Sequence, residues 1–280
     1  MKIANYFYQN RTWIGRVNGN DIQPLFPDKS LDDLLGKEGG LGQLGQAAAG
    51  GPSLDLKSVK LLPPVLRPPK ILCIGLNYRD HCRENNVPIP PNPVIFSKFT
   101  TALTGAGDPI VMPSITQKLD YEAELAVVIG RGGKHIPESQ ALSHVAGYTA
   151  MNDVSARDIQ FGDGQWIRGK TLDTFAPLGP WLVTPDELGD PNRLAIRCRL
   201  NGQTVQDSST GEMIFPVPVL IAFISQAITL LPGDVISTGT PHGVGVFRKP
   251  PLFMRPGDAV EVEIEKIGTL RNPVTAEARS

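Results

Sequence analysis

This chain lacks most features that mark a secreted or membrane protein. Its 280 residues include three cysteines, Cys73, Cys82 and Cys198. An odd number without paired spacing argues against a disulfide framework and a thiolate zinc site, and it indicates a reducing compartment. No apolar run is long enough to span a membrane, and the start, Met-Lys-Ile-Ala-Asn-Tyr, has neither a signal core nor a transit stretch. We therefore expect a cytoplasmic protein with no membrane partner.

The chain also has no excess of positively or negatively charged residues. Lys and Arg number 27 against 28 for Asp and Glu, which leaves a formal net charge of -1. This balance provides no electrostatic footprint for nucleic acid, so we expect no nucleic-acid partner. With 41% hydrophobic residues, the chain is long enough to bury a substantial core as one or two domains.

The most informative feature that is present is the segment 119–130, Leu-Asp-Tyr-Glu-Ala-Glu-Leu-Ala-Val-Val-Ile-Gly. In a strand, Glu122 and Glu124 share one face with Ala126 and Val128, while the other face is wholly apolar. Neither face is polar enough to be the solvent side. Water is therefore a poor partner for these two glutamates.

A second strand of the same chain shows the contrast. In 259–265, Ala-Val-Glu-Val-Glu-Ile-Glu, apolar residues alternate with glutamates that form one solvated face. In the earlier strand, two carboxylates about 7 Å apart on an apolar face should repel each other, take up a proton or hold a cation. A divalent metal ion resolves this conflict best.

Asp153 is the third acidic candidate, in the segment 147–160 at the end of an apolar strand that could pair beside the glutamates. Three carboxylates form a hard-oxygen site suited to Mg²⁺ or Mn²⁺ rather than zinc, with positions open for a substrate. Alone, Asp153 also fits a capping or turn role. Together with Glu122 and Glu124, it favours a metal site.

His81 and Glu84 lie three residues apart on an expected short helix, and so on one face. The carboxylate could orient the imidazole as a general base. The alternative is an ordinary hydrogen bond at the surface.

Further polar candidates follow in the chain. Arg157, Gln160 and Lys170 are close enough to share a cavity, where they could bind a carboxylate and stabilise an enolate oxygen. In 239–245, Gly-Thr-Pro-His-Gly-Val-Gly, the Thr240 hydroxyl and backbone amides could hold an anionic substrate end. Solvated loop charges and a plain turn are the alternatives.

Residues 164–171, Gly-Gln-Trp-Ile-Arg-Gly-Lys-Thr, formally match a phosphate-binding loop. We reject this interpretation because such a loop leaves a buried strand and enters a helix, whereas residues 158–163 are polar and prolines follow in 171–180. Nucleotide hydrolysis remains a weak rival.

Most of the expected elements are strands separated by turns, with few long helices. This pattern favours a β-rich α+β fold over a doubly wound sheet. A small β unit at 2–24 and a Gly/Ala-rich flexible connector at 37–52 precede the main domain, and Asn77 is expected to cap the short helix. We expect strands at 70–75, 93–99, 122–129, 145–152, 180–184, 234–238 and 259–265, a hairpin at 194–207 turning at Asn201-Gly202, and helices near 29–36, 77–86 and 217–231.

Several of these segments together resemble the fumarylacetoacetate hydrolase family. The segments, in the family's order, are 75–84, 120–130, 152–160, 169–179 and 238–245. The resemblance covers roughly residues 65–275, and Val-Phe-Arg-Lys-Pro-Pro at 246–251 is most similar to the second type of FAH-domain-containing protein. It implies a mixed β-sandwich roll, usually a homodimer, with a small N-terminal α+β domain at 1–62 and a catalytic domain at 63–280.

The resemblance also implies roles for the candidate residues. Glu122, Glu124 and Asp153 match the metal ligands. His81 and Glu84 match a water-activating pair on a lid, and Lys170 matches the enolate-stabilising lysine. Arg157, Gln160 and Thr240 match the groups that hold the α-keto acid end of the substrate.

The activity implied is metal-dependent chemistry on a 2-oxo or 2,4-diketo acid. Hydrolysis of an acylpyruvate to pyruvate and a carboxylic acid is the expected reaction, because a water-activating pair has an obvious use there. Oxaloacetate enol-keto tautomerisation, oxaloacetate decarboxylation and isomerisation of a ring-cleavage dioate are the alternatives. A non-enzymatic rival is a binding protein in which the acids hold a structural Mg²⁺ or Ca²⁺ ion.

Overall fold

Strand β11, Ala123–Ile129, lies at the centre of the fold, and all of its residues are buried. This computed structural model describes residues 1–278. In it, β11 pairs with β12 (Val145–Asn152) on one side and β17 (Val235–Ser237) on the other. Alternate side chains of β11 join two different hydrophobic clusters. The expected burial of this strand on both faces is confirmed.

The sheet that contains β11 is mixed and has 12 strands, with β17 parallel to β6 and most other pairs antiparallel. Its main path runs β4-β3-β2-β1-β14-β12-β11-β17-β6-β7, with β5 beside β1 and β8 beside β14. The remaining strands of this sheet are β1 (Lys2–Tyr8), β2 (Arg11–Asn18), β3 (Asp21–Pro27), β4 (Leu54–Asp55), β5 (Lys60–Leu62), β6 (Ile71–Gly75), β7 (Val94–Lys98), β8 (Leu103–Thr104) and β14 (Ala176–Val183).

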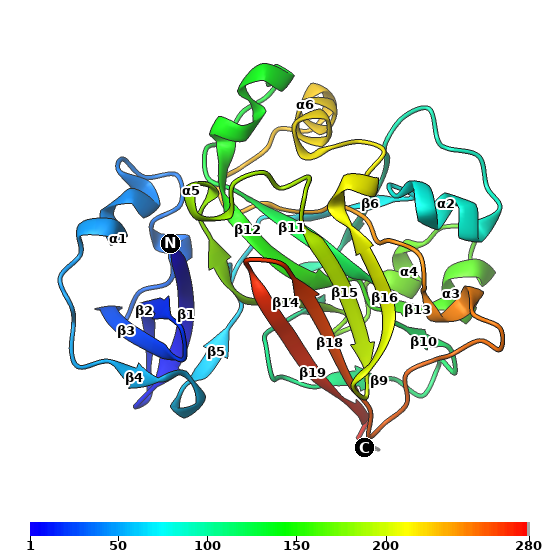
Figure 1. Cartoon of the computed structure of the whole chain (residues 1–280), viewed down its shortest axis with the longest axis horizontal. Coiled ribbons are helices and arrows are strands. Elements are labelled where there is room, and N and C mark those ends of the chain that lie inside the picture. The colour runs from blue at the N-terminus through cyan, green and yellow to red at the C-terminus, as the bar shows by residue number, and fades with distance from the viewer. Residues whose placement is uncertain (279–280) are drawn as a thin grey trace.

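A second sheet of five strands packs across β11, β12 and β14 (Figure 1). Its order is β16-β15-β18-β19-β9, and the largest hydrophobic cluster fills the space between the two sheets. The strands are β9 (Ile110–Met112), β15 (Ala195–Leu200), β16 (Gln203–Ser209), β18 (Ala259–Ile264) and β19 (Gly268–Ala276), and a separate pair joins β10 (Leu119–Asp120) to β13 (Ser155–Ala156). The predicted β-rich α+β sandwich is therefore confirmed.

In the part of the chain that the structure describes, the α-helices are few and short. They are α1 (Gln43–Gln46), α2 (Arg79–Asn85), α3 (Arg157–Gly162), α4 (Ile167–Lys170), α5 (Pro185–Leu188) and α6 (Val217–Ala227). The predicted apolar helix 217–231 ends earlier, at Ala227, because Ile228 is extended. The helix predicted near 29–36 is only a 3₁₀ turn, Leu31–Asp33.

The N-cap prediction at Asn77 was wrong. Tyr78 occupies the N-cap position of α2. The Asn77 amide instead donates to the carbonyls of Phe215 (3.1 Å) and Thr238 (2.7 Å), so it satisfies buried backbone rather than the helix end.

Residues 37–52, expected to be a flexible connector, make specific contacts. They contain α1, whose Leu44 is fully buried. The side chain of Gln23 donates to the carbonyl of Gly51 at 2.7 Å, and Arg16 donates to the carbonyl of Leu44 at 2.5 Å. This stretch thus packs on the N-terminal strands because its carbonyls meet polar side chains there.

The C-terminal strand β19 was missed in the sequence. Only alternate residues of it, Leu270, Asn272 and Val274, are buried. A buried asparagine and Pro273 interrupt the apolar pattern. Strand β14 similarly begins before the predicted 180–184, because glycine and proline within it hid its start.

The N-terminal strands join the large sheet directly. Lys2 and Ile3 of β1 pair with Val183 and Leu182 of β14, so one sheet continues from the N-terminal part into the main part. The division into domains 1–62 and 63–280 stays a prediction, and its last two residues, 279–280, lie outside the described residues. In the described part of the chain, no helix combines the length and apolar character needed to cross a bilayer.

We predict that Leu125→Ala lowers the free energy of unfolding by about 2–5 kcal/mol, because Leu125 is fully buried in β11 and its removal leaves a cavity. Urea denaturation measures this change. Leu142→Ala is the control, since Leu142 is 44% exposed and should change stability by less than about 0.5 kcal/mol. Equal losses in the two variants would contradict the central position of β11.

Candidate active site

Glu122, Glu124 and Asp153 meet in a single cluster. Their closest carboxylate oxygens all lie within 4.8 Å of one another, and the three residues are 5%, 2% and 0% exposed. The pairing of β11 with β12 produces this meeting, because Ala123 is opposite Asn152. The residues flanking that pair, Glu122 before β11 and Asp153 after β12, are therefore neighbours.

Three buried cations surround the acids. Lys170, at the end of α4, donates to Glu122 Oε2 at 2.6 Å and to Asp153 Oδ2 at 2.8 Å. Arg157, at the start of α3, donates to Glu122 Oε1 at 2.6 Å. Lys98, at the end of β7, lies 2.7 Å from Asp153 Oδ1. Two of the three acids are thus paired with cations.

The pKa shifts of the two glutamates run in opposite directions. Burial alone would raise the pKa of Glu122, but the charges of Lys170 and Arg157 outweigh it, so that pKa is lowered. Burial raises the pKa of Glu124, and the neighbouring charges of Asp153 and Glu122 raise it further. Glu124 is therefore the acid whose charge the protein compensates least.

The residues fit a divalent cation on this evidence. Within residues 1–278, both hydrogen bonds accepted by Glu124 go to Oε2, from Ser237 Oγ at 2.5 Å and from the Gly239 amide at 2.9 Å. No hydrogen bond to Oε1 is described in these residues, and the carboxylate lies beside two others, where a hard dication can balance the charge. Three converging carboxylates are a donor set that Mg²⁺ and Mn²⁺ favour.

His81 belongs to the same cavity. Its Nδ1 lies 3.2 Å from Glu84 Oε2, and its Nε2 lies 3.3 Å from the amide nitrogen of Asn85. A carboxylate accepts only, and the Asn85 amide nitrogen donates only, so this network assigns the proton to Nδ1 and a lone pair to Nε2. The expected His81–Glu84 pair is formed, and Nε2 can act as a base once substrate replaces Asn85 as the partner of its lone pair.

Arg157 lies at the centre of a hydrogen-bond network. Its Nε donates to Asp120 Oδ2 at 2.8 Å, and its Nη1 donates to Gln160 Oε1 at 3.0 Å. Asp120 in turn accepts the backbone amides of Gly245 (2.7 Å) and Val246 (3.0 Å). Arg157 and Gln160 are thereby tied to the glycine-rich loop.

That loop carries Thr240, whose hydroxyl accepts a hydrogen bond from Gln206 Nε2 at 2.9 Å. Gly239 precedes it with a φ of +98°, and a Cβ there would lie 2.8 Å from Asn77 Cβ. Glycine is needed at 239 because the conformation is left-handed and the approach is close. The loop backbone therefore holds Thr240 in a defined place.

Of the site residues predicted from the sequence, all except Glu84 line one cavity of about 80 Å³. The structure brings together His81, Glu122, Glu124, Asp153, Arg157, Gln160, Lys170 and Thr240. Glu84 does not line the cavity but hydrogen-bonds to the His81 imidazole. In Figure 1, α2, α3 and α4 gather at the same end of the sheets, where this cavity lies. The aromatic side chains of Phe96, Phe161, Trp166 and Phe247 complete its walls.

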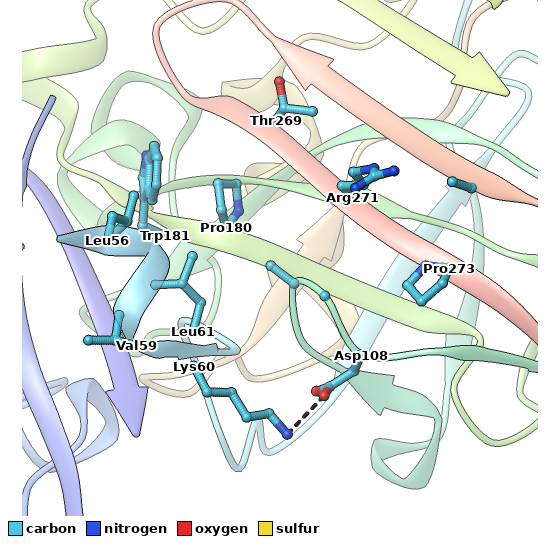
Figure 2. Close-up of a pocket in the computed structure, with 13 residues that line it drawn as sticks. Leu56, Val59, Lys60, Leu61, Asp108, Pro180, Trp181, Thr269, Arg271 and Pro273 are labelled. Carbon is cyan, nitrogen blue, oxygen red and sulfur yellow. Dashed lines mark ion pairs between the residues drawn. The ribbon is translucent and has the colours of Figure 1, made fainter. Parts of the chain in front are cut away.

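A larger cavity of about 740 Å³ lies elsewhere, between the segment around β5 and strands β14 and β19 (Figure 2). Trp181 and Leu61 form part of its apolar wall. Among its described lining residues the only acid is Asp108, which pairs with Lys60 at 2.9 Å. Without a cluster of acids, bases or nucleophiles, it is not the site of the chemistry, despite its size.

Sequence reasoning missed several residues of the site. Lys98 ends a strand of ordinary composition, and a lysine in that position is usually solvated. In the structure its ammonium group is buried and donates to the carbonyls of Val154 (2.9 Å), Phe175 (2.8 Å) and Lys170. Asn85 and Asp120 were also missed, although Asn85 lies in the helix expected near 77–86 and Asp120 in the segment 119–130.

The phosphate-loop pattern at 164–171 does not form a phosphate loop. It covers α4, which has four residues and follows helix α3 rather than a strand. Its lysine, Lys170, is bound to Glu122 and Asp153. The rejection of nucleotide binding at this pattern agrees with the structure.

Comparison with known proteins identifies relatives of this arrangement. Residues 70–275 match the family described as fumarylacetoacetate (FAA) hydrolase C-terminal. The mitochondrial oxaloacetate tautomerase FAHD2A of Bos taurus is 50% identical over 263 residues, which cover 93% of this chain and 84% of that protein. The mitochondrial oxaloacetate tautomerase FAHD2A of Homo sapiens has the same identity and the same coverage.

Solved structures agree with this match. A fumarylacetoacetate hydrolase from the psychrophilic Exiguobacterium antarcticum is 38% identical, with a TM-score of 0.88 over 99% of this chain and 100% of that one. A 2-hydroxyhepta-2,4-diene-1,7-dioate isomerase from Mycobacterium marinum is 36% identical, with a TM-score of 0.81 over 100% of both chains. Similar folds thus occur in proteins named for different reactions.

We predict that Glu124→Gln weakens Mg²⁺ and Mn²⁺ binding at least about tenfold, because it removes a negative charge from a buried three-carboxylate site. Isothermal titration calorimetry of the metal alone measures this, and so does the rise in Tm on metal addition. Glu261→Gln, on the solvated face of β18, is the matched control and should bind like the wild type. Unchanged affinity in Glu124→Gln would remove Glu124 from the ligand set.

Proposed function

The chain belongs to the fumarylacetoacetate hydrolase family, and we propose that within this enzyme family it catalyses the enol-keto tautomerisation of oxaloacetate. Two relatives that share 50% of aligned residues are named oxaloacetate tautomerases. The structure of a protein named as a hydrolase is more distant, at 38%. The hydrolytic reaction expected from the sequence is not confirmed, and these relatives favour the tautomerase alternative.

The 50% identity to two proteins named oxaloacetate tautomerases carries this proposal, and the small site cavity is compatible with it. Its volume of about 80 Å³ is far below the roughly 300–1,000 Å³ of pockets for drug-sized ligands. Hydrolysis of an acylpyruvate requires room for an attacking water beside the substrate. Tautomerisation of a four-carbon acid requires no such water, so a small cavity is compatible with it.

A Mg²⁺ or Mn²⁺ ion is part of the proposal, with Glu122, Glu124 and Asp153 as its ligands. When bound, such an ion supplies Lewis acidity that favours the enolate form of a 2-oxo acid. The choice between the two metals is left to experiment. The protein's own groups then have three tasks: holding the substrate, stabilising the enolate oxygen and moving the proton.

We assign substrate binding to Arg157, Gln160 and Thr240, because each has an N–H or O–H donor that no described hydrogen bond uses. Arg157 has five N–H groups and uses Nε, Nη1 and Nη2 once each on Asp120, Gln160 and Glu122. Gln160 uses its carbonyl oxygen on Arg157, which leaves its amide hydrogens. Thr240 accepts from Gln206, which leaves its hydroxyl hydrogen. Together these groups can bind a substrate carboxylate.

Proton transfer is assigned to His81, with Glu84 as its support. In the keto-to-enol direction, Nε2 takes a proton from C3 of the substrate, the C–H electron pair forms the C2–C3 double bond, and the C2 carbonyl electrons move to oxygen. The His81 imidazolium then gives its proton to that oxygen, which yields the enol and restores the neutral imidazole. Lys170 donates to the developing oxyanion, and Glu84 stabilises the charged imidazole. The reverse sequence converts the enol to the ketone.

The location and the assembly remain predictions. The relatives from Bos taurus and Homo sapiens are named as mitochondrial, which does not support the expected cytoplasmic location. The homodimer expected from the family resemblance is kept as a proposal, and analytical ultracentrifugation tests it.

We predict that the metal-loaded protein converts enol-oxaloacetate to its keto form faster than it cleaves acylpyruvates or fumarylpyruvate or decarboxylates oxaloacetate. Enol absorbance and pyruvate release, measured in Mg²⁺ and in Mn²⁺, separate these reactions. His81→Asn should lower kcat for tautomerisation about 10²- to 10⁴-fold, because it removes the base.

His135→Ala, at an exposed histidine after β11, is the control and should retain full activity. Acylpyruvate cleavage faster than tautomerisation would restore the hydrolase assignment. Full turnover in excess chelator would refute the role of the metal.

A further inference from the structure

Helix α2 delivers His81 to the cavity, yet it has only seven residues. Isolated helices of this length are unstable in water, so the place of α2 depends on contacts with the rest of the molecule. Its first turn is attached through Arg79, which donates to the Met213 carbonyl at 2.9 Å. The attachments on the side of the glycine-rich loop involve Asp80 and Glu84.

Asp80 is adjacent to His81 and is nearly buried, with a side chain that is 10% exposed. Its Oδ2 accepts hydrogen bonds from Ser208 Oγ of β16 at 2.6 Å and from His242 Nδ1 at 2.9 Å. One carboxylate oxygen thus connects α2 to strand β16 and to the loop 239–245.

The loop side of this contact is firmly placed. Gly243 has a φ of +97°, and a Cβ there would lie 2.3 Å from the carbonyl oxygen of Val205 in β16. The Gly243 amide also donates to Glu84 Oε1 at 2.9 Å. His242 therefore extends from a backbone that packs against β16, and its side chain reaches back to α2.

The same loop carries Thr240, which we assign to substrate binding. The segment Thr240–Gly243 thus contacts the substrate at one end and α2 at the other. His242 itself is exposed, with 47% of its side chain accessible, and lies outside the site cavity. The one hydrogen bond described for its side chain goes to Asp80 of α2, whereas its backbone carbonyl accepts from Gln206 at 3.4 Å, which also donates to Thr240.

We propose that His242 is a positioning residue whose hydrogen bond to Asp80 latches α2 against the loop and so keeps His81 facing the carboxylate cluster. This inference deepens the proposed function and rests on it for the role of His81. Loss of the latch leaves the metal ligands and the substrate-binding groups intact, but it lets α2 move and withdraws the base from C3.

The test uses two substitutions at the same position. His242→Ala removes the hydrogen bond, whereas His242→Asn retains a donor where Nδ1 stood and carries no charge. Hydrogen exchange of the α2 amides, residues 79–85, is measured by mass spectrometry in the substrate-free and metal-free full chain. Tautomerase kcat and KM are measured in parallel with the metal-loaded protein.

We expect amide exchange in α2 to be about tenfold faster in His242→Ala, the size of effect for a lost hydrogen bond to a charged group. Its kcat should fall by a similar factor while KM changes less than twofold, because the substrate-binding groups are untouched. His242→Asn should restore both quantities to near the wild-type values. His135→Ala should change neither.

Wild-type exchange in His242→Ala would overturn the proposal, as would equally fast exchange in the Ala and Asn variants. A parallel rise in KM and fall in kcat, without faster exchange, would also overturn it by showing direct contact with the substrate. The exchange readout needs no turnover, so a protein without tautomerase activity but with a loosened α2 in His242→Ala would refute the proposed function and leave the latch standing.

Discussion

Incomplete compensation of buried charge governs the structure around the site. Within residues 1–278, four buried carboxylates and three buried cations meet there: Asp120, Glu122, Glu124 and Asp153 with Lys98, Arg157 and Lys170. A buried charge without a partner costs several kcal/mol, so the chain must bring all of these groups together when it folds. Glu124 is the acid that remains without a cation, and it defines the place where a dication fits.

The chain satisfies this constraint with segments that are far apart in sequence. Strand β11, the residue before it and the residue after β12 supply the three clustered acids, and the segment that follows β12 folds back to supply Arg157 and Lys170. Lys98, from β7, holds that returning segment by hydrogen bonds to three of its carbonyls. The same residues that stabilise the backbone therefore determine where Lys170 lies relative to the carboxylates. Stability and chemistry depend on one network.

Much of this site was predictable because it leaves a local signal. Glu122 and Glu124 are charged residues in a predicted strand that is otherwise apolar. A buried carboxylate needs a cation or hydrogen-bond donor wherever the strand packs. The pairs His81–Glu84 and Arg157–Gln160 have the spacing of one helical turn, and the structure forms both contacts. Lys98 left no such signal, because a lysine at a strand end has the same local pattern whether it is solvated or buried.

The prediction that Asn77 caps α2 was wrong because it, too, depended on local sequence alone. Its local pattern fits a cap, but Asn77 lies opposite the backbone of Phe215 and Thr238, more than 130 residues later in the chain, and those carbonyls take its amide hydrogens. Likewise, the role of Asp80 depends on Ser208 and His242, which only the packing of α2 places beside it. Hydrogen-bond partners of this kind are set by distance in space, and separation along the chain carries no information about them.

By itself, the sequence determined the β-rich character of the protein, the strand buried on both faces and the acids that must find a cation, since these follow from residue type and local spacing. Only the tertiary structure decided which cations pair with which acids, how small the cavity is and how α2 is attached. Those outcomes depend on contacts between distant segments, whose geometry arises when the two sheets pack together and exclude water.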